Sequence, residues 1–305
     1  MSDTAVVAPA VTGAANEDSA PTKRRIGVAA WLSIGWLAFV LIGAVLAPVL
    51  PVGNPNDFLN NPTQVPAFTS GHFFGTDAVG GDTLARVMYG ARASMLIAVL
   101  SIVFGTIIGG FVGLLAGYLR GKVGTVLASI FDILLAFPPL LLAITLVSTL
   151  APVDQSNPPS WGKRIWVVAL AVGLVSIPIL ARITRANTLA WSQREFVMAA
   201  RAQGAKPLRI MVREVLPNVV PAMLSVALLG VANVIIVEGG LALFGLSINP
   251  PDASWGNMIA DQVDDLGKAP HVWIVPSIAI FLTVMALNTL GDFVRERFSV
   301  REAAI

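Results

Sequence analysis

Cysteine is absent from the 305-residue sequence, and charged residues are scarce. Without cysteine the chain can form no disulfide, no thiolate metal site and no cysteine nucleophile. Its two histidines, His72 and His271, lie far apart in the sequence and near no acidic cluster with metal-ligand spacing, so we expect no metal site. Charged residues make up 12% of the chain, against roughly 25% in soluble domains. This scarcity excludes a disordered chain, a nucleic-acid-binding domain and an ordinary soluble enzyme.

Long apolar runs take the place of charge, and the mean hydropathy is +0.77. Six such runs cover residues 26–50, 93–119, 123–150, 165–181, 219–248 and 272–290. Each is long enough to cross ~30 Å of hydrocarbon at 1.5 Å per residue. The first run follows a basic cluster, as a signal peptide would, but its 25 residues exceed the usual apolar core of about 7–15. The prediction is an all-α integral membrane protein with six transmembrane helices.

The distribution of Lys and Arg predicts the orientation of these helices. Six spans place both termini on one side, and the segments on that side hold 15 of the 20 basic residues. Because basic residues gather in cytoplasmic segments, both termini are expected in the cytoplasm. The predicted organisation is a disordered cytoplasmic tail (1–25), a first transmembrane helix with an outer loop (26–92), a five-helix core (93–294) and a cytoplasmic C-terminal tail (295–305).

Two acidic residues interrupt apolar runs and are candidates for the translocation pathway or its gate. Residues 133–150 can span unaided, so Asp132 is expected at the inner interface with 122–131 along the surface. Glu238 follows 19 apolar residues, which places it near the outer interface. There Gly239-Gly240 would break the helix before a short re-entrant segment, 241–248. Such groups either mark a pathway or serve as interface anchors and buried pairs, and the sequence leaves both alternatives open.

Small residues and prolines shape the second, third and fourth spans. Gly105, Gly109, Gly113 and Gly117 repeat every four residues along one helix face. This ladder lets another helix approach closely, either within the chain or from a second subunit. Pro138-Pro139 and Pro178 are expected to kink their helices.

The longest inner loop, 182–217, predicts two short helices. Ser192 and Glu195 fit a capping box that would begin a helix over 193–203, and Gly204 is placed to end it in a left-handed conformation. Pro207 would begin the second helix and Pro217 would stop it before the fifth span.

The second helix has one apolar face, and both helices need a surface to dock on. Leu208, Met211, Val212 and Val215 follow helical spacing. Helices this short are marginal alone in water, so they must pack on the bilayer, on the span ends or on a partner protein. DNA binding is excluded because the loop is tethered between two spans and no recognition helix concentrates basic residues.

The segment 198–204, continuing to Leu216-Pro217, resembles the EAA loop of ABC-importer permeases. Ala199, Ala200 and Gly204 match in register with Leu216-Pro217, whereas Met198 and Glu214 depart from the general pattern. The longer string 194–218 is similar to the dipeptide/oligopeptide/nickel subfamily, which departs at the same places. Further motifs resembling that subfamily's C-type permease are Gly75-Thr76-Asp77, Tyr89-Gly90-Ala91-Arg92, Phe244-Gly245-Leu246, Ser254-Trp255-Gly256 and Leu290-Gly291-Asp292.

The resemblance implies an ABC type I importer permease fold in the bacterial cytoplasmic membrane, with a cytoplasmic coupling helix in the EAA loop at about 190–217. It implies half of a peptide pathway completed by a second homologous permease, two ABC ATPase subunits carrying ATP and magnesium, and an extracytoplasmic substrate-binding protein. The residues it assigns to ATPase coupling are Glu195, Ala199, Ala200, Arg201, Gly204, Ala205, Leu216 and Pro217. The chain itself is expected to be no enzyme and to hold no cofactor.

The sequence itself supports this division of labour because it lacks a nucleotide-binding loop. Gly121-Lys122 is followed by Val123, and Ala116 stands where a phosphate-binding loop needs its first glycine. Nickel or another small solute remains an alternative cargo. The weaker alternatives are a secondary transporter, which lacks support because no internal repeat is visible, and a membrane enzyme, for which no catalytic cluster appears.

Overall fold

The computed structural model describes residues 27–58, 61–69, 71–119, 121–150, 152, 159–263 and 266–302, without the side chains of 298–302. The predicted N-terminal tail therefore lies outside the described residues. The helices are α1 (Val28–Leu46), α2 (Thr83–Tyr118), α3 (Lys122–Leu135), α4 (Pro139–Leu150), α5 (Trp161–Trp191), α6 (Glu195–Ala202), α7 (Pro207–Ile210), α8 (Leu216–Leu243), α9 (Trp255–Ala260) and α10 (Pro270–Glu302). A π-helical turn, Met211–Val215, joins α7 to α8.

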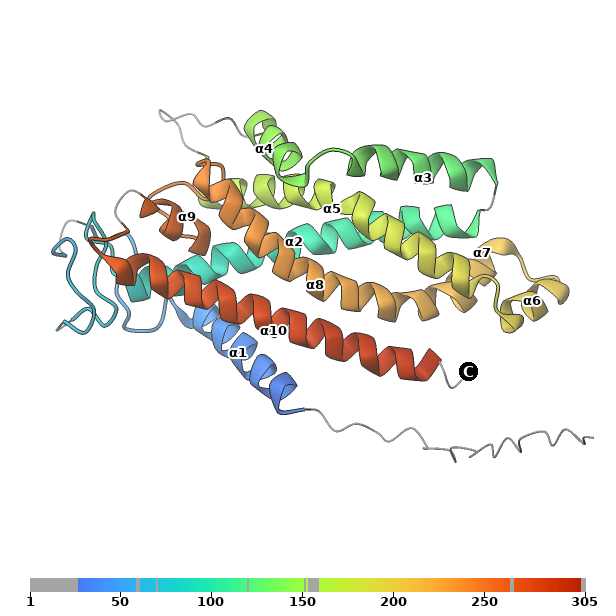
Figure 1. The fold of residues 1–305 in the computed structure, drawn as a ribbon, viewed down its shortest axis with the longest axis horizontal. Helices are drawn as coiled ribbons and strands as arrows, with labels where there is room; N and C mark the ends of the chain where they lie inside the picture. The colour runs from blue at the N-terminus through green and yellow to red at the C-terminus, as the bar shows by residue number, and fades with distance from the viewer. Residues whose placement is uncertain are drawn as a thin grey trace, which may run out of the picture.

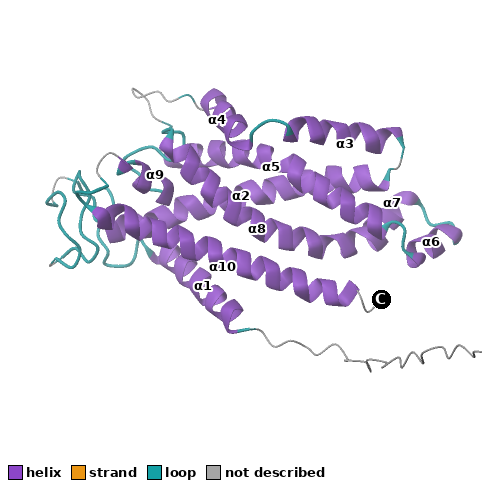
Figure 2. Ribbon diagram, in the orientation of Figure 1, coloured by secondary structure: helices purple, strands orange, loops and turns teal. Residues whose placement is uncertain are grey.

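The described part of the chain is a helical bundle, as predicted (Figure 2). Five segments are long and apolar enough to cross a membrane, and α3 with α4 forms a sixth if the bent pair counts as one span. The long helices α2, α5, α8 and α10 run along the length of the molecule (Figure 1). Helix α6 lies at one end, and α9 with the loop between α1 and α2 lies at the other. We refer to these as the α6 end and the α9 end.

The third apolar run is divided into two helices. Helices α3 and α4 meet at an angle of 86°, and α3 includes residues 133–135, so residues 133–150 do not form the separate span that was expected. The predicted kink at Pro138-Pro139 is confirmed, because proline cannot donate the backbone hydrogen bond that would continue α3. Pro178, by contrast, lies inside α5 without interrupting it.

The glycine ladder of α2 packs against α5 within the chain. A Cβ at Gly109 would lie 2.7 Å from the carbonyl oxygen of Ile177, and one at Gly117 would lie 2.6 Å from Cβ of Thr188. Both distances are shorter than real contacts allow, so glycine permits the two helices to touch along their backbones. The intramolecular alternative for this ladder is therefore confirmed.

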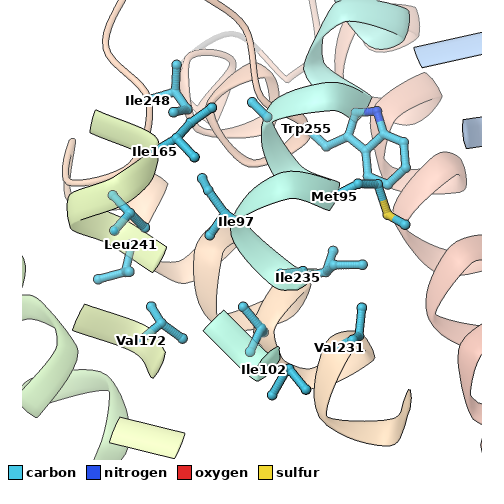
Figure 3. Close-up of a cluster of buried hydrophobic side chains, with 14 of the residues drawn as sticks. Met95, Ile97, Ile102, Ile165, Val172, Val231, Ile235, Leu241, Ile248 and Trp255 are labelled. Atoms are coloured by element: carbon cyan, nitrogen blue, oxygen red, sulfur yellow. The ribbon is translucent and has the colours of Figure 1, made fainter. Parts of the chain in front are cut away.

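The main core lies between α2, α5 and α8 toward the α9 end. Figure 3 shows Ile97 and Ile102 of α2, Val172 of α5 and Ile235 of α8 among its apolar side chains. Trp255 of α9 is also part of this core, and its indole N–H donates to the carbonyl of Val87 on α2 at 2.9 Å. The core thus ties the short helix α9 to the long helices.

Candidate functional site

Helix α6 is fastened to the bundle by one buried side chain. Val197 is fully buried in a cluster that joins α6 to the ends of α2, α5 and α8. The cluster comprises Leu114, Trp191, Val197, Ile210, Met211, Val215 and Val219. The guanidinium of Arg201 also lies 5.7 Å from the ring centre of Tyr118 on α2. The helix is therefore seated on the bundle while its outward side remains open.

The C-terminus of α6 confirms the predicted role of Gly204. This residue has φ +79°, the left-handed conformation. Its N–H donates to the carbonyl of Arg201 at 3.0 Å, and the N–H of Ala205 donates to that of Ala200 at 3.1 Å. These two bonds form a Schellman motif, in which glycine avoids the strain that a Cβ would add.

Two other expectations for this loop were wrong. Helix α6 begins at Glu195 after Arg194, and the hydroxyl of Ser192 donates back to the carbonyl of Leu189 in α5, so no capping box forms. Pro217 does not stop the second helix, because α7, the π-helical turn and α8 follow one another without a break. Proline is tolerated there because the π-helical turn directly before α8 has already replaced the regular α-helical hydrogen-bond pattern.

The second short helix has only half of the apolar face that was predicted. Met211 and Val215 are buried, whereas 67% of Leu208 and 46% of Val212 remain exposed. The wider turn of the π-helical segment shifts the register, so four apolar residues at α-helical spacing do not all face the bundle.

The predicted coupling residues divide into an exposed set and a packed set. Glu195, Ala199, Arg201, Gly204 and Pro217 are exposed. Ala200, Ala205 and Leu216 are partly buried against the cluster around Val197. The outward side of α6 therefore presents the carboxylate of Glu195 and the methyl of Ala199, with Met198 exposed beside them, whereas Arg201 is exposed on the side that meets Tyr118.

Glu238 occupies a fully buried position in α8 and receives hydrogen bonds from three segments. The hydroxyl of Ser94 on α2 donates at 3.1 Å and that of Ser254, at the start of α9, donates at 2.7 Å. The hydroxyl of Ser247, in the loop between α8 and α9, donates to the same carboxylate. Among the described residues no cation lies within 4.0 Å of it. The carboxylate therefore joins α2, α8 and α9 through hydroxyls alone, and we call these four residues the Glu238 hub.

The surroundings of the Glu238 hub correct the expected helix break. Helix α8 continues through Gly239-Gly240 to Leu243, so residues 241–248 are not a separate re-entrant segment. A Cβ on Gly256 of α9 would lie 2.8 Å from Cα of Gly239. Gly239 and Gly256 thus allow α9 to pack closely on α8, beside the fully buried side chain of Glu238.

Asp132, the other candidate, lies in a different environment. Its side chain is 63% exposed near the end of α3, and its carboxylate is 3.9 Å from the guanidinium of Arg182 on α5, itself 68% exposed. An ion pair this exposed contributes little to stability. The structure brings Asp132 and Glu238 into no common site.

A buried arginine fixes the loop at the α9 end. Arg86, in the first turns of α2, lies 3.0 Å from Asp77 in the loop and 3.7 Å from Asp261 after α9. Its guanidinium also lies 5.5 Å from the ring centre of Phe58. Burial raises the pKa of Asp261, an effect that Arg86 opposes and Asp77 reinforces. Arg86 therefore connects the loop, α2 and the segment after α9.

Sequence reasoning missed the serines that surround Glu238. Ser94 and Ser247 carry no local signal, because Ser94 is 144 residues and Ser247 is 9 residues from Glu238 in the sequence. Ser254 had one, because its hydroxyl accepts from the N–H of Asn257 while the Asn257 amide accepts from the Ser254 N–H. This reciprocal capping marks the start of α9 in the sequence.

Comparison with known proteins identifies the class. The sequence profile of the family described as "Binding-protein-dependent transport system inner membrane component" matches residues 109–302, and the chain belongs to this family. It is thus the membrane component of a transport system, a multi-pass inner-membrane permease subunit and not an enzyme.

Curated relatives agree with this assignment. The dipeptide transport system permease protein DppC of Alkalihalophilus pseudofirmus is 34% identical over 264 residues, covering 85% of this chain and 81% of its own length. The glutathione transport system permease protein GsiD of Pectobacterium atrosepticum is 37% identical over 228 residues, covering 75% and 72%. The di/tripeptide transport system permease protein DppC of Pseudomonas aeruginosa is 35% identical over 275 residues, covering 87% and 86%. The predicted resemblance to this subfamily is confirmed.

A solved structure confirms the fold. The MetNI methionine ABC transporter, in an inward-facing conformation, contains a chain that aligns with a TM-score of 0.57 at 20% identity. The alignment covers 69% of this chain and 95% of that one. The bundle is therefore an ABC importer permease fold.

Proposed function

We propose that this chain is the transmembrane subunit of an ATP-driven importer of di- or oligopeptides. A second homologous permease completes the pathway, two ABC ATPases hold ATP and magnesium, and an extracytoplasmic binding protein delivers the peptide. The names of the relatives, which are peptide, dipeptide and glutathione permeases, support the cargo. The absence of a phosphate-binding loop from the sequence supports a separate source of energy.

Helix α6 is the element that we assign to ATPase coupling, and its geometry is the observation that carries the proposal. A helix of 8 residues is not stable alone in water, so α6 depends on the contacts of Val197 with the bundle. Its other side is exposed at one end of the bundle. Glu195 and Ala199 on that side, and the exposed Arg201 beside Tyr118, would contact the ATPase. Ala200, Ala205 and Leu216 would pass its movement to the ends of α5 and α8.

The α6 end is the cytoplasmic end in this proposal. Basic residues at that end include Arg194, Arg209 and Arg213. The segments assigned to this side hold 15 of the 20 basic residues, against five at the α9 end, which also carries Asp252 and Asp261. This asymmetry supports cytoplasmic termini. The α9 end would then face the binding protein.

Glu238 is our candidate for a residue that controls the outer gate. It is fully buried and connects α9 and its preceding loop to α2 and α8, so movement of α9 and this loop must rearrange its hydrogen bonds from Ser254 and Ser247. We do not extend this role to Asp132, because it lies in an exposed pair with Arg182 and is not part of the Glu238 hub.

The test is peptide uptake by the complete importer reconstituted in liposomes with its binding protein. We expect ATP-dependent accumulation of a labelled dipeptide, and strong loss of accumulation and of peptide-stimulated ATP hydrolysis in Gly204→Val. A β-branched residue in the left-handed conformation costs about 1–2 kcal/mol or more, which would unwind the end of α6.

Gly204→Asn is the matched control, since asparagine tolerates the left-handed conformation and a Cβ at this position meets no atom within 4 Å. It should retain most uptake. Equal, wild-type uptake in both variants would remove α6 from the coupling role.

A further inference from the structure

A cavity of 390 Å³ at the α9 end contains two charged groups of opposite sign that do not pair with each other. It lies between the segment after α1, the start of α2, the start of α5 and the segment before α9. Its lining includes Asn56, Tyr89, Arg92, Trp161 and Asp252. Its volume falls within the ~300–1,000 Å³ typical of pockets for small ligands.

Arg92 is held in place by aromatic rings rather than by an acid. Its guanidinium lies 6.0 Å from the ring centre of Tyr89 and 5.9 Å from that of Trp161. In the described part of the chain no carboxylate comes within 4.0 Å of it. A stacked guanidinium keeps its N–H groups available for bidentate bonds to a carboxylate. Arg92 therefore presents an anion-binding group to the cavity.

Asp252 and Asn56 provide the opposite preference, for a positively charged group. Asp252 is half-buried, and its carboxylate makes no ion pair among the residues that the structure describes. The side-chain oxygen of Asn56 is buried and accepts no hydrogen bond there. A carboxylate and an amide oxygen are both acceptors that suit an ammonium group. The cavity thus joins a site for a carboxylate to a site for an ammonium.

We infer that this cavity is a binding subsite for a short zwitterionic peptide, with Arg92 on its C-terminal carboxylate and Asp252 and Asn56 on its N-terminal ammonium. Both termini of a free peptide are charged near neutral pH. Tyr89 and Trp161 supply apolar surface for the peptide's side chains. This inference rests on the proposed import of peptides and adds that the permease itself recognises both peptide ends.

The experiment uses the complex of permeases and ATPases in nanodiscs, without the binding protein, which would contribute its own selectivity. Ligand-observed NMR titrations compare L-alanyl-L-alanine with its C-terminal amide and its N-acetyl derivative. The wild-type complex should bind the free dipeptide about tenfold more tightly than either derivative, as expected for charged hydrogen bonds.

A substitution at either end of the cavity should abolish the selectivity for one charged peptide terminus and leave the selectivity for the other. Arg92→Gln should bind the dipeptide and its amide equally while still discriminating against the N-acetyl derivative, and Asp252→Asn should do the reverse. Such a pattern cannot arise from general damage to the fold. Lys163→Gln is the matched control, because Lys163 is exposed in the same first turn of α5 as Trp161 but does not line the cavity.

Two results would overturn the inference while leaving the importer intact. One is peptide transport by the complete system with no selectivity for charged termini in the binding titrations. The other is a loss of binding-protein association in Arg92→Gln without any change in peptide selectivity, which would make the cavity a docking contact. If the complete wild-type system transports no peptide at all, the proposed function itself fails.

Discussion

Glu238 combines complete burial with three hydroxyl donors, an environment that the sequence could indicate only in part. Its position after 19 apolar residues predicted a residue near the outer interface, and the structure adds that its side chain is fully buried within the protein. The partners could not be predicted, because Ser94 and Ser254 reach it from other elements. The glycines beside it were misread for the same reason, since the helix α9 that packs against Gly239 is remote in sequence.

Replacing Glu238 with glutamine tests its role in the gate. Glutamine keeps the volume but turns charge-assisted hydrogen bonds into neutral ones, a difference of about 1 kcal/mol for each bond. It also directs an amide donor toward hydroxyls that are already donating. We expect Glu238→Gln to assemble normally and to slow peptide uptake several-fold in proteoliposomes. Uptake at the wild-type rate would show that the Glu238 hub has a structural role and does not control the gate.

The close-packing face of α2 is the feature that the sequence predicted best, because a four-residue glycine repeat defines one face of a helix. That α5 is its partner came from the structure. The break between α3 and α4 was located by its two prolines, but its angle was not predictable from composition. In the loop around α6, Gly204 was predicted correctly because left-handed backbone favours glycine. The capping box failed because Ser192 belongs to the preceding helix, where its hydroxyl already bonds to Leu189.

Two separate glycine-to-alanine variants distinguish the effect of helix packing from the effect of helix propensity on stability. Gly109→Ala should destabilise the protein by about 1–3 kcal/mol, because its Cβ would crowd the backbone of α5. Gly35→Ala in α1 meets no atom within 4 Å and should stabilise the helix by roughly 0.5–1 kcal/mol. Thermal unfolding of the purified subunit in detergent measures both. A similar melting temperature for the two variants would contradict the close packing of α2 on α5.

The asymmetry between the two ends of the bundle was predicted from charge, and it sets the orientation that the proposed function requires. The chain has no native cysteine, so single cysteines can be introduced at exposed positions. A thiol reagent that cannot cross the membrane should label Asn54→Cys in intact cells and should label Gln203→Cys only after the membrane is opened. Labelling of position 203 from outside would invert the topology.

The contact between α6 and an ATPase can be examined most directly by cross-linking. A photoreactive amino acid at position 199, on the exposed side of α6, is illuminated in the purified importer, and the same group at position 54 serves as the control. We predict that position 199 cross-links to an ATPase subunit and that position 54 does not. An importer in which position 199 reaches only lipid, or in which position 54 captures the ATPase, would contradict the assignment of α6 as the coupling helix.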